Sequence, residues 1–315
     1  MQTQLTDARA ADLSRSARPI FQTLIILCFS SLLGWQFAAL FWLGDLHLSV
    51  DQLQVYGAME RPFVYRQLIP MLARLIIWIT GIRVDLGLVI GIMLSAMAAV
   101  GAIGLFFREF GIRKLELHTL ICGTILFVWL IKDAKIYDFA TVATLAGCII
   151  LLHQHKWNGF HIVYILACLN RETAFLLTIF FMFHFFRKLD RKLYWLSAVA
   201  QVLIFLAIRL IMLLAFRENP GVVAQFNFFK NFQEFASSWT GTIAVITVFV
   251  GLTWLVARNW KSAPVFLRDI FLIFTPLLFV MWILFGRAFE LRVFFEMFPV
   301  LYIMAVGIKF GSLRL

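Results

Sequence analysis

The sequence predicts an all-α fold, a polytopic transmembrane helix bundle of about ten spans, and three observations carry this prediction. The chain is 62% hydrophobic with a mean hydropathy of +0.90, whereas soluble domains are closer to half apolar. Its apolar residues form runs of the length that crosses a bilayer. Basic residues gather in alternate connections between these runs, which is typical of a multi-pass membrane protein with a defined orientation.

The polar segment 1–19 is interpreted as a cytoplasmic tail, because no A-x-A-like cleavage site follows the first apolar core. The remainder, 20–315, is expected to form a single transmembrane domain. Its expected spans are 20–43, 86–107, 116–132, 137–153, 159–170, 173–186, 193–216, 239–257, 268–286 and 294–309.

Residues 65–81 (YRQLIPMLARLIIWITG) carry Arg66 and Arg74 on an apolar helix, which could cross the membrane or lie in its interface. If this helix does not cross, the cytoplasmic side holds 16 basic and 6 acidic residues, and the outer side holds 11 of each. The positive-inside rule favours that asymmetry. We therefore expect an amphipathic interfacial helix in a first outer loop, 44–84, a second large outer loop at 217–238, and both termini on the cytoplasmic side of the inner (cytoplasmic) membrane.

The net charge of +11 is attributed to loops beside anionic lipid, and no nucleic-acid partner is expected. The four cysteines lie in apolar runs without a C-x-x-C or a His/Cys cluster, so neither a disulfide framework nor a zinc site is expected. The sequence contains no G-x-S-x-G, H-E-x-x-H or P-loop motif of a soluble enzyme.

The stretch ILACLNRETAFLLTIFFMF places Asn170, Arg171 and Glu172 inside an apolar segment, where a central charge costs roughly 2.5–3.5 kcal/mol. One continuous helix here would also put the basic run 187–192 on the outer side. We therefore predict a break into two half-helices, with Asn170 capping the second and Glu172 in its first turn. Because non-helical backbone at membrane depth must be buried in protein or line a cavity, the break is predicted to form a cavity wall.

In this topology the unusual polar clusters all fall on the outer side, which predicts one site at the outer membrane–water boundary. They lie in the first loop (Asp45, Asp51, Arg61, Tyr65, Arg66), the hairpin IKDAKIYDF (Lys135, Tyr137, Asp138), the break, and the turn GRAFELRVFFEMFP (Arg287, Glu290, Arg292, Glu296). Adjacent helical residues do not face each other, so Arg171 and Glu172 need partners elsewhere. The candidates are Asp138, Glu290 and Arg292.

Two clusters also have simpler interpretations. Arg292 and Glu296 are four residues apart and could neutralise each other on one helix face. Tyr137 and Asp138 could mark only a helix start with an aromatic residue at the interface. The sequence leaves these alternatives open.

This layout of a first span, an outer loop with acidic residues and an amphipathic helix, and many spans of uneven length resembles the GT-C superfamily of polyprenyl-phosphate-sugar-dependent glycosyltransferases. The segments RPFVYRQLIP (61–70), YDFATVATLAG (137–147) and LNRETAFLL (169–177) are also similar to those of small bacterial membrane proteins with that layout. The resemblance implies transfer of a sugar from a polyprenyl-phosphate donor to a glycan, lipid or protein acceptor at the extracytoplasmic face. It implies that a first-loop carboxylate, Asp45 or Asp51, is the base and that basic residues hold the lipid-linked phosphate. The chain departs from better-known members, which often have an adjacent acidic pair.

Sugar transfer needs a carboxylate to take the acceptor proton and fixed positive charge for the developing phosphate. The arginine fork suits phosphate oxygens. The phosphate-binding candidates are Arg61, Arg66, Arg171 and Arg292. The other residues expected to bind substrate are Tyr65, Tyr137, Asp138, Asn170, Glu172, Arg287, Glu290 and Glu296. We expect inverting displacement without a tightly bound cofactor or a protein-bound metal cluster.

Two other function classes compete with an enzyme. A transporter or flippase of a lipid-linked or anionic substrate would use Glu172 and Asp138 as proton-coupling groups, but it needs polar residues in the cytoplasmic half, where only Arg209 stands out. A non-catalytic subunit of an envelope-polysaccharide assembly would dock a partner on the polar face. Asp45→Asn separates transfer from docking, because only transfer requires the carboxylate.

Overall fold

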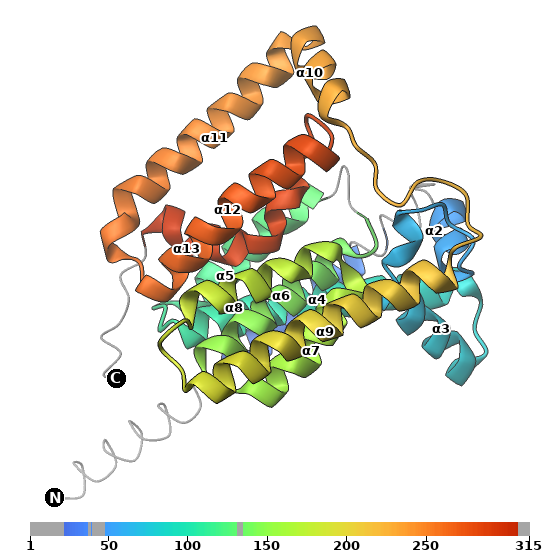
Figure 1. Ribbon diagram of the computed structural model, residues 1–315, viewed down its shortest axis with the longest axis horizontal. Helices are drawn as coiled ribbons and strands as arrows, with labels where there is room; N and C mark the ends of the chain where they lie inside the picture. The colour runs from blue at the N-terminus through green and yellow to red at the C-terminus, as the bar shows by residue number, and fades with distance from the viewer. Residues whose placement is uncertain (1–21, 37–38, 40–47, 131–134, 308–315) are drawn as a thin grey trace, which may run out of the picture.

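The computed structural model of the protein describes residues 22–36, 39, 48–130 and 135–307, and these residues form helices and no strand (Figure 1). The helices are Gln22–Gln36, α2 (Leu48–Val55), η1 (Phe63–Tyr65), α3 (Leu68–Thr80), α4 (Val84–Glu109), α5 (Leu115–Leu130), α6 (Asp138–His153), α7 (Trp157–Asn170), η2 (Glu172–Ala174), α8 (Phe175–His184), α9 (Arg191–Ala215), α10 (Phe228–Ser237), α11 (Trp239–Asn259), η3 (Trp260–Ser262), α12 (Val265–Phe285), η4 (Leu291–Met297) and α13 (Phe298–Val306).

Four of the described helices are long and apolar enough to cross a membrane, and they indicate a membrane protein. They are Val84–Glu109, Arg191–Ala215, Trp239–Ser262 and Val265–Phe285. Each of the ten expected spans contains a helix, but the other helices are shorter than the roughly 20 residues that span hydrocarbon. The number of ten crossings therefore stays a prediction.

Helix α4 carries small residues at every fourth position along its first half, which lets other helices approach its backbone closely. Gly87 lies against Ile77 and Ala73 of α3, and Gly91 lies against Ile69, so α3 runs antiparallel to α4. Helix α3 has 13 residues and is therefore only about 20 Å long.

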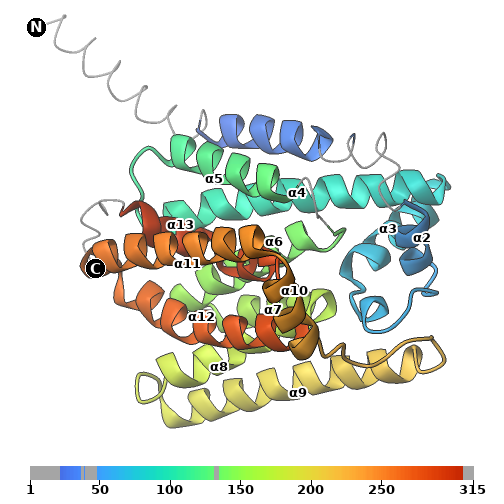
Figure 2. The ribbon, with the colours of Figure 1, turned by 90° about the horizontal axis from the view of Figure 1, so that it is seen from above.

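Helices α4 and α6 end side by side, since His153 Nδ1 lies 2.7 Å from Glu109 Oε1. Because α6 is ten residues shorter than α4, the first half of α4 extends beyond the start of α6. This extension packs with α2 and α3. These two helices and η1 (Leu48–Thr80), here called the lobe, lie at one end of the bundle in both views (Figures 1 and 2).

The predicted break in the segment 159–186 is confirmed. Helix α7 ends at Asn170, Arg171 is extended with φ −152° and ψ 150°, and η2 and α8 continue the chain. Two carbonyls at the end of α7 accept hydrogen bonds from other parts of the chain. Cys168 O accepts from Arg209 Nη2, and Leu169 O accepts from Gln67 N at 2.9 Å. External donors thus stabilise the interrupted helix.

Candidate functional site: a cationic cavity beside the broken helix

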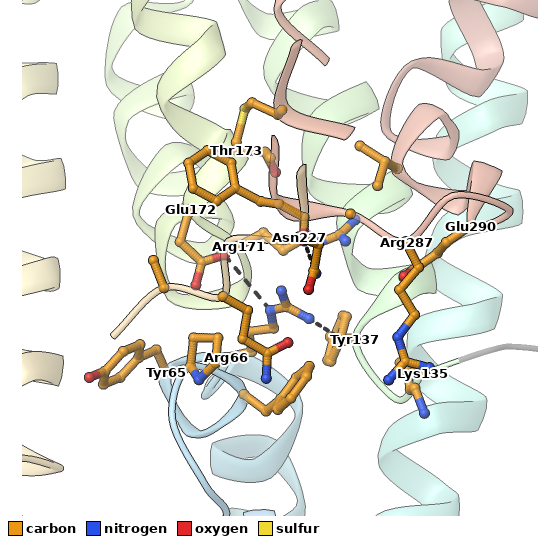
Figure 3. Close-up of a pocket in the computed structure, with 18 of the residues that line it drawn as sticks. Tyr65, Arg66, Lys135, Tyr137, Arg171, Glu172, Thr173, Asn227, Arg287 and Glu290 are labelled. Atoms are coloured by element: carbon orange, nitrogen blue, oxygen red, sulfur yellow. Dashed lines mark hydrogen bonds and ion pairs between the residues drawn. The ribbon is translucent and has the colours of Figure 1, made fainter. Parts of the chain in front are cut away.

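A cavity of about 1010 Å³ lies between the lobe, the broken helix, α9 and the corner formed by α10, α12 and the turn after α12 (Figure 3). It joins most of the clusters that the sequence predicted to converge. Eight predicted site residues line it: Tyr65, Arg66, Tyr137, Arg171, Glu172, Arg287, Glu290 and Arg292. The prediction that the break forms a cavity wall is confirmed.

Glu172 lies between two guanidinium groups that come from opposite sides. Arg66 Nε is 3.7 Å from Glu172 Oε2, and Arg209 Nη1 is 3.3 Å from Glu172 Oε1. Since Arg209 also donates to Cys168 O, it connects α9 to both sides of the break. The sequence-based candidates for the partner of Glu172 did not include either arginine, so that prediction was wrong.

Arg66 is held in place through both its side chain and its backbone. Its Nη1 donates to the Tyr137 hydroxyl, and its Cζ lies 4.3 Å from the Tyr137 ring centroid (Figure 3). Gln54 Nε2 donates to the carbonyls of Phe63 and Arg66 at 2.9 and 3.1 Å, which fixes the backbone of η1. Burial lowers the pKa of this guanidinium, but Tyr137 and Glu172 outweigh it and raise the pKa above the ordinary value. Arg66 is therefore a permanent cation.

Arg171 forms a buried ion pair with Glu296, with Nη1 2.7 Å from Oε1 and side chains only 8% and 1% exposed. The pair joins the break to η4 across 125 residues of chain. Glu296 was not among the predicted partners of Arg171, and it does not pair with Arg292. The interpretation of Arg292 and Glu296 as an intrahelical pair is therefore wrong.

Arg292 instead contacts two carboxylates. Its Nε donates to Glu290, and its Nη1 lies 3.4 Å from Asp138 Oδ2. Asp138 Oδ2 also accepts from the backbone N of Lys135 at 2.8 Å. Burial lowers the pKa of Arg292, whereas Asp138, Tyr137 and Glu290 raise it, and the net shift is upward. Tyr137 and Asp138 thus do more than start α6.

Three predicted site residues, Asp138, Asn170 and Glu296, lie behind the cavity wall. Asn170 is fully buried, and its Nδ2 donates to Tyr137 O at 3.1 Å and to Thr141 Oγ1 at 2.7 Å. Its predicted role as a helix cap is wrong, because these bonds direct its side chain to α6. The three residues support the wall from behind.

Residues 216–227, here called the strap, close one side of the cavity with Val223, Ala224 and Gln225. Asn219 Nδ2 donates to the carbonyls of Gly57 and Met59 at 2.7 and 2.8 Å. Arg61 lies outside the lining, where its Nη2 donates to Gly221 O at 2.8 Å. Its position supports a role in holding the strap, not the predicted phosphate contact.

Two cations of the cavity have no carboxylate partner among the described residues, Lys135 and Arg287. Each guanidinium of Arg66, Arg209, Arg171 and Arg292 contacts a glutamate or aspartate. Six basic and three acidic side chains line the cavity (Arg66, Lys135, Arg171, Arg209, Arg287, Arg292; Glu172, Glu234, Glu290). The wall is therefore positive, and its free positive charge is at Lys135 and Arg287.

The other part of the lining is apolar. Met212 and Leu213 come from α9, Met281 and Phe285 from α12, and Phe289 from the turn. Helix α9 also has a row of exposed leucines along one face, including Leu206, Leu210 and Leu214. An amphiphile could place an anionic group at the basic wall of the cavity and an apolar chain along its apolar lining.

Neither predicted base has a described side chain: Asp45 lies outside the described residues, and for Asp51 the structure describes only the backbone, in α2. No group of three His, Cys, Asp or Glu suited to a metal occurs among the described residues. Both assignments of a base stay predictions.

Sequence reasoning missed Arg209 and Glu234 as lining residues, and gave Lys135 no role. Arg209 carried a usable signal, because a lone arginine in an apolar span needs a partner inside the bundle. Nothing in the sequence marks Glu234 as a site residue, because Lys230 lies four residues before it and such a spacing is typical of an exposed ion pair on a helix surface.

Comparisons of the chain with protein families, curated proteins and solved structures found no match.

Proposed function

We propose that the protein is a membrane-embedded glycosyltransferase that moves a sugar from a polyprenyl-phosphate donor to an acceptor at the extracytoplasmic face. The observation that carries the proposal is a cavity in which Lys135 and Arg287, two cations with no carboxylate partner in the part of the chain that the structure describes, share the lining with an apolar wall. A lipid-linked sugar phosphate has these two chemical parts.

The phosphate is assigned to Lys135 and Arg287. In sugar transfer the phosphate becomes the leaving group, so it needs cations that no protein carboxylate neutralises. Arg287 offers a planar fork and Lys135 a mobile point charge. The paired arginines keep the basic wall in shape, and the polyprenyl chain lies against Met281 and Phe285, with its remainder in lipid.

The proposed setting is the inner membrane, with about ten crossings, the cavity near the outer surface and both termini in the cytoplasm. Support comes from the charge asymmetry of the connections. Helix α3 then lies in the outer interface. Its exposed face includes Leu75, Trp78 and Ile79, and a tryptophan is common at that depth.

The first test measures binding of farnesyl phosphate and of farnesol to the purified protein in detergent. We expect farnesyl phosphate to bind more tightly, and Lys135→Ala/Arg287→Ala to weaken its binding at least about ten-fold, since hydrogen bonds to charged groups contribute about 1.5–3 kcal/mol. The matched control is Arg83→Ala/Arg217→Ala, which removes two exposed arginines outside the cavity. Equal binding of both probes would refute the phosphate site.

The second test measures sugar transfer from a panel of polyprenyl-phosphate hexoses to a cell-envelope extract, with release of polyprenyl phosphate as the readout. Detergent solution contains no compartments, so product there distinguishes transfer from transport. Phosphate-dependent binding without transfer from any donor would favour a carrier of lipid-linked substrate.

A further inference from the structure

The three described carboxylates that line the cavity differ in what holds them. Glu172 contacts Arg66 and Arg209, and Glu290 accepts from Arg292 Nε. Guanidinium contacts stabilise a carboxylate as an anion and occupy its lone pairs, which makes it a weak proton acceptor.

Glu234 is held much more loosely. Its one ion-pair partner within the described part of the chain is Lys230, whose Nζ lies 4.0 Å away on the same helix, and 33% of the Glu234 side chain is exposed. A contact of that kind between exposed groups is weak. Among the described carboxylates of the cavity, Glu234 therefore has lone pairs available to a ligand.

The position of Glu234 is nevertheless well defined. Asn231, on the same helix, is 3% exposed and donates to the carbonyls of Ile283 and Gly286 at 2.9 and 3.0 Å. Phe235 packs on Trp282 and Phe289, with ring centroids 5.8 and 5.5 Å apart. Helix α10 is thus fastened to the end of α12 and to the turn that carries Arg287.

We propose that Glu234 is the general base that activates the acceptor hydroxyl, an inference that rests on the proposed function. A base and a phosphate-binding arginine on one rigid corner have a fixed relation to each other, as displacement at a carbon between them requires. The base then belongs to the second outer loop, and not to the first loop with Asp45 or Asp51.

The reaction balances with these groups. The Glu234 carboxylate takes the acceptor hydroxyl proton while the acceptor oxygen forms a bond to the anomeric carbon. The bond from that carbon to the phosphate oxygen breaks, and its electron pair leaves with the polyprenyl phosphate, whose charge Lys135 and Arg287 stabilise. The products are a glycoside of inverted configuration, polyprenyl phosphate and protonated Glu234, which returns its proton to water.

The experiment compares Glu234→Gln with Glu218→Gln, a matched change at an exposed glutamate of the strap that lies outside the cavity lining. We expect Glu234→Gln to lower kcat of transfer by about 10²–10⁴-fold and to leave the Kd for farnesyl phosphate unchanged. Glu234→Asp should recover part of the rate, and Glu218→Gln should retain all of it.

Transfer at the wild-type rate by Glu234→Gln, with loss of transfer in Asp45→Asn or Asp51→Asn, would overturn the assignment of Glu234 and leave the proposed function intact. Absence of transfer in the wild-type protein, despite phosphate-dependent binding, would instead refute the proposed function and the base together. Retained binding of farnesyl phosphate by each variant shows that the cavity is still folded.

Discussion

At the scale of single residues, the cavity depends on ion pairs that hold four of its arginines in place. Arg171 and Glu296 are buried together, and each is tolerated there only because the other is present, since an uncompensated buried charge is very costly. Arg209 contacts a carboxylate and a backbone carbonyl at once, which suits a planar fork. These side chains set the shape of the cavity wall.

Removing either partner of the buried pair should destabilise the protein far more than removing both. We expect Arg171→Met and Glu296→Met each to lower the free energy of unfolding by about 3–5 kcal/mol, and the double variant to recover most of that loss. Reversible unfolding in mixed micelles measures the three values. Losses that simply add in the double variant would contradict the pairing.

Arg209→Lys should not replace the arginine, because one ammonium group cannot reproduce the fork that reaches both Glu172 and Cys168 O. We expect a loss of about 1–3 kcal/mol of stability, seen as a lower Tm. The control is Arg217→Lys, at an exposed pair with Glu218, where no change is expected. Equal Tm values for the two variants would argue against the double contact.

At the scale of elements, the strap forms hydrogen bonds with the lobe at one end and with α12 at the other, two parts of the molecule that are far apart in sequence. Arg61 N donates to Pro220 O, and Arg61 Nη2 donates to Gly221 O, both at 2.8 Å. The far end is fastened where Asn227 N donates to Leu284 O at 2.8 Å. The strap therefore bridges the lobe and the α10–α12 corner over the cavity.

Gly221 tests this bridge, because its φ is +95° and a Cβ there would lie 2.6 Å from Arg61 O. Gly81 is the control, since its φ is +69° and nothing lies within 4 Å of its Cβ position. We expect Gly81→Ala to cost only the left-handed backbone strain, about 1–2 kcal/mol, and Gly221→Ala to cost more. Faster proteolysis within residues 216–227 should accompany only the second change, and equal proteolysis would contradict it.

At the scale of the whole molecule, the cavity and the His153–Glu109 contact lie toward opposite ends of the bundle. The cavity is therefore placed on one side of the membrane if α4 crosses it. Exposed positions report which side: Val222, in the strap, is 56% exposed, and the side chain of Lys188, after α8, is 51% exposed.

We expect an impermeant maleimide applied to intact cells to label Val222→Cys and to spare Lys188→Cys, in a background with the four native cysteines replaced by alanine. Labelling of Lys188→Cys after the cells are opened shows that the site is reactive. The reverse pattern would place the cavity on the cytoplasmic side and remove the basis for transfer at the outer face.

The sequence by itself determined the helical nature of the chain, the break at residues 170–172 and the approach of distant polar clusters to one another. These follow from hydropathy and from the cost of charge in hydrocarbon, which act on each segment regardless of its neighbours. Eight of the predicted residues accordingly line one cavity.

Only the tertiary structure decided which charges neutralise one another. Arg171 pairs with Glu296 and Glu172 with Arg209, although Asp138, Glu290 and Arg292 were equally plausible partners by sequence. Ion pairing depends on distances of a few ångströms between side chains from separate helices, and no local pattern encodes these distances. The same distances leave Lys135 and Arg287 without a carboxylate partner among the described residues and leave Glu234 loosely held.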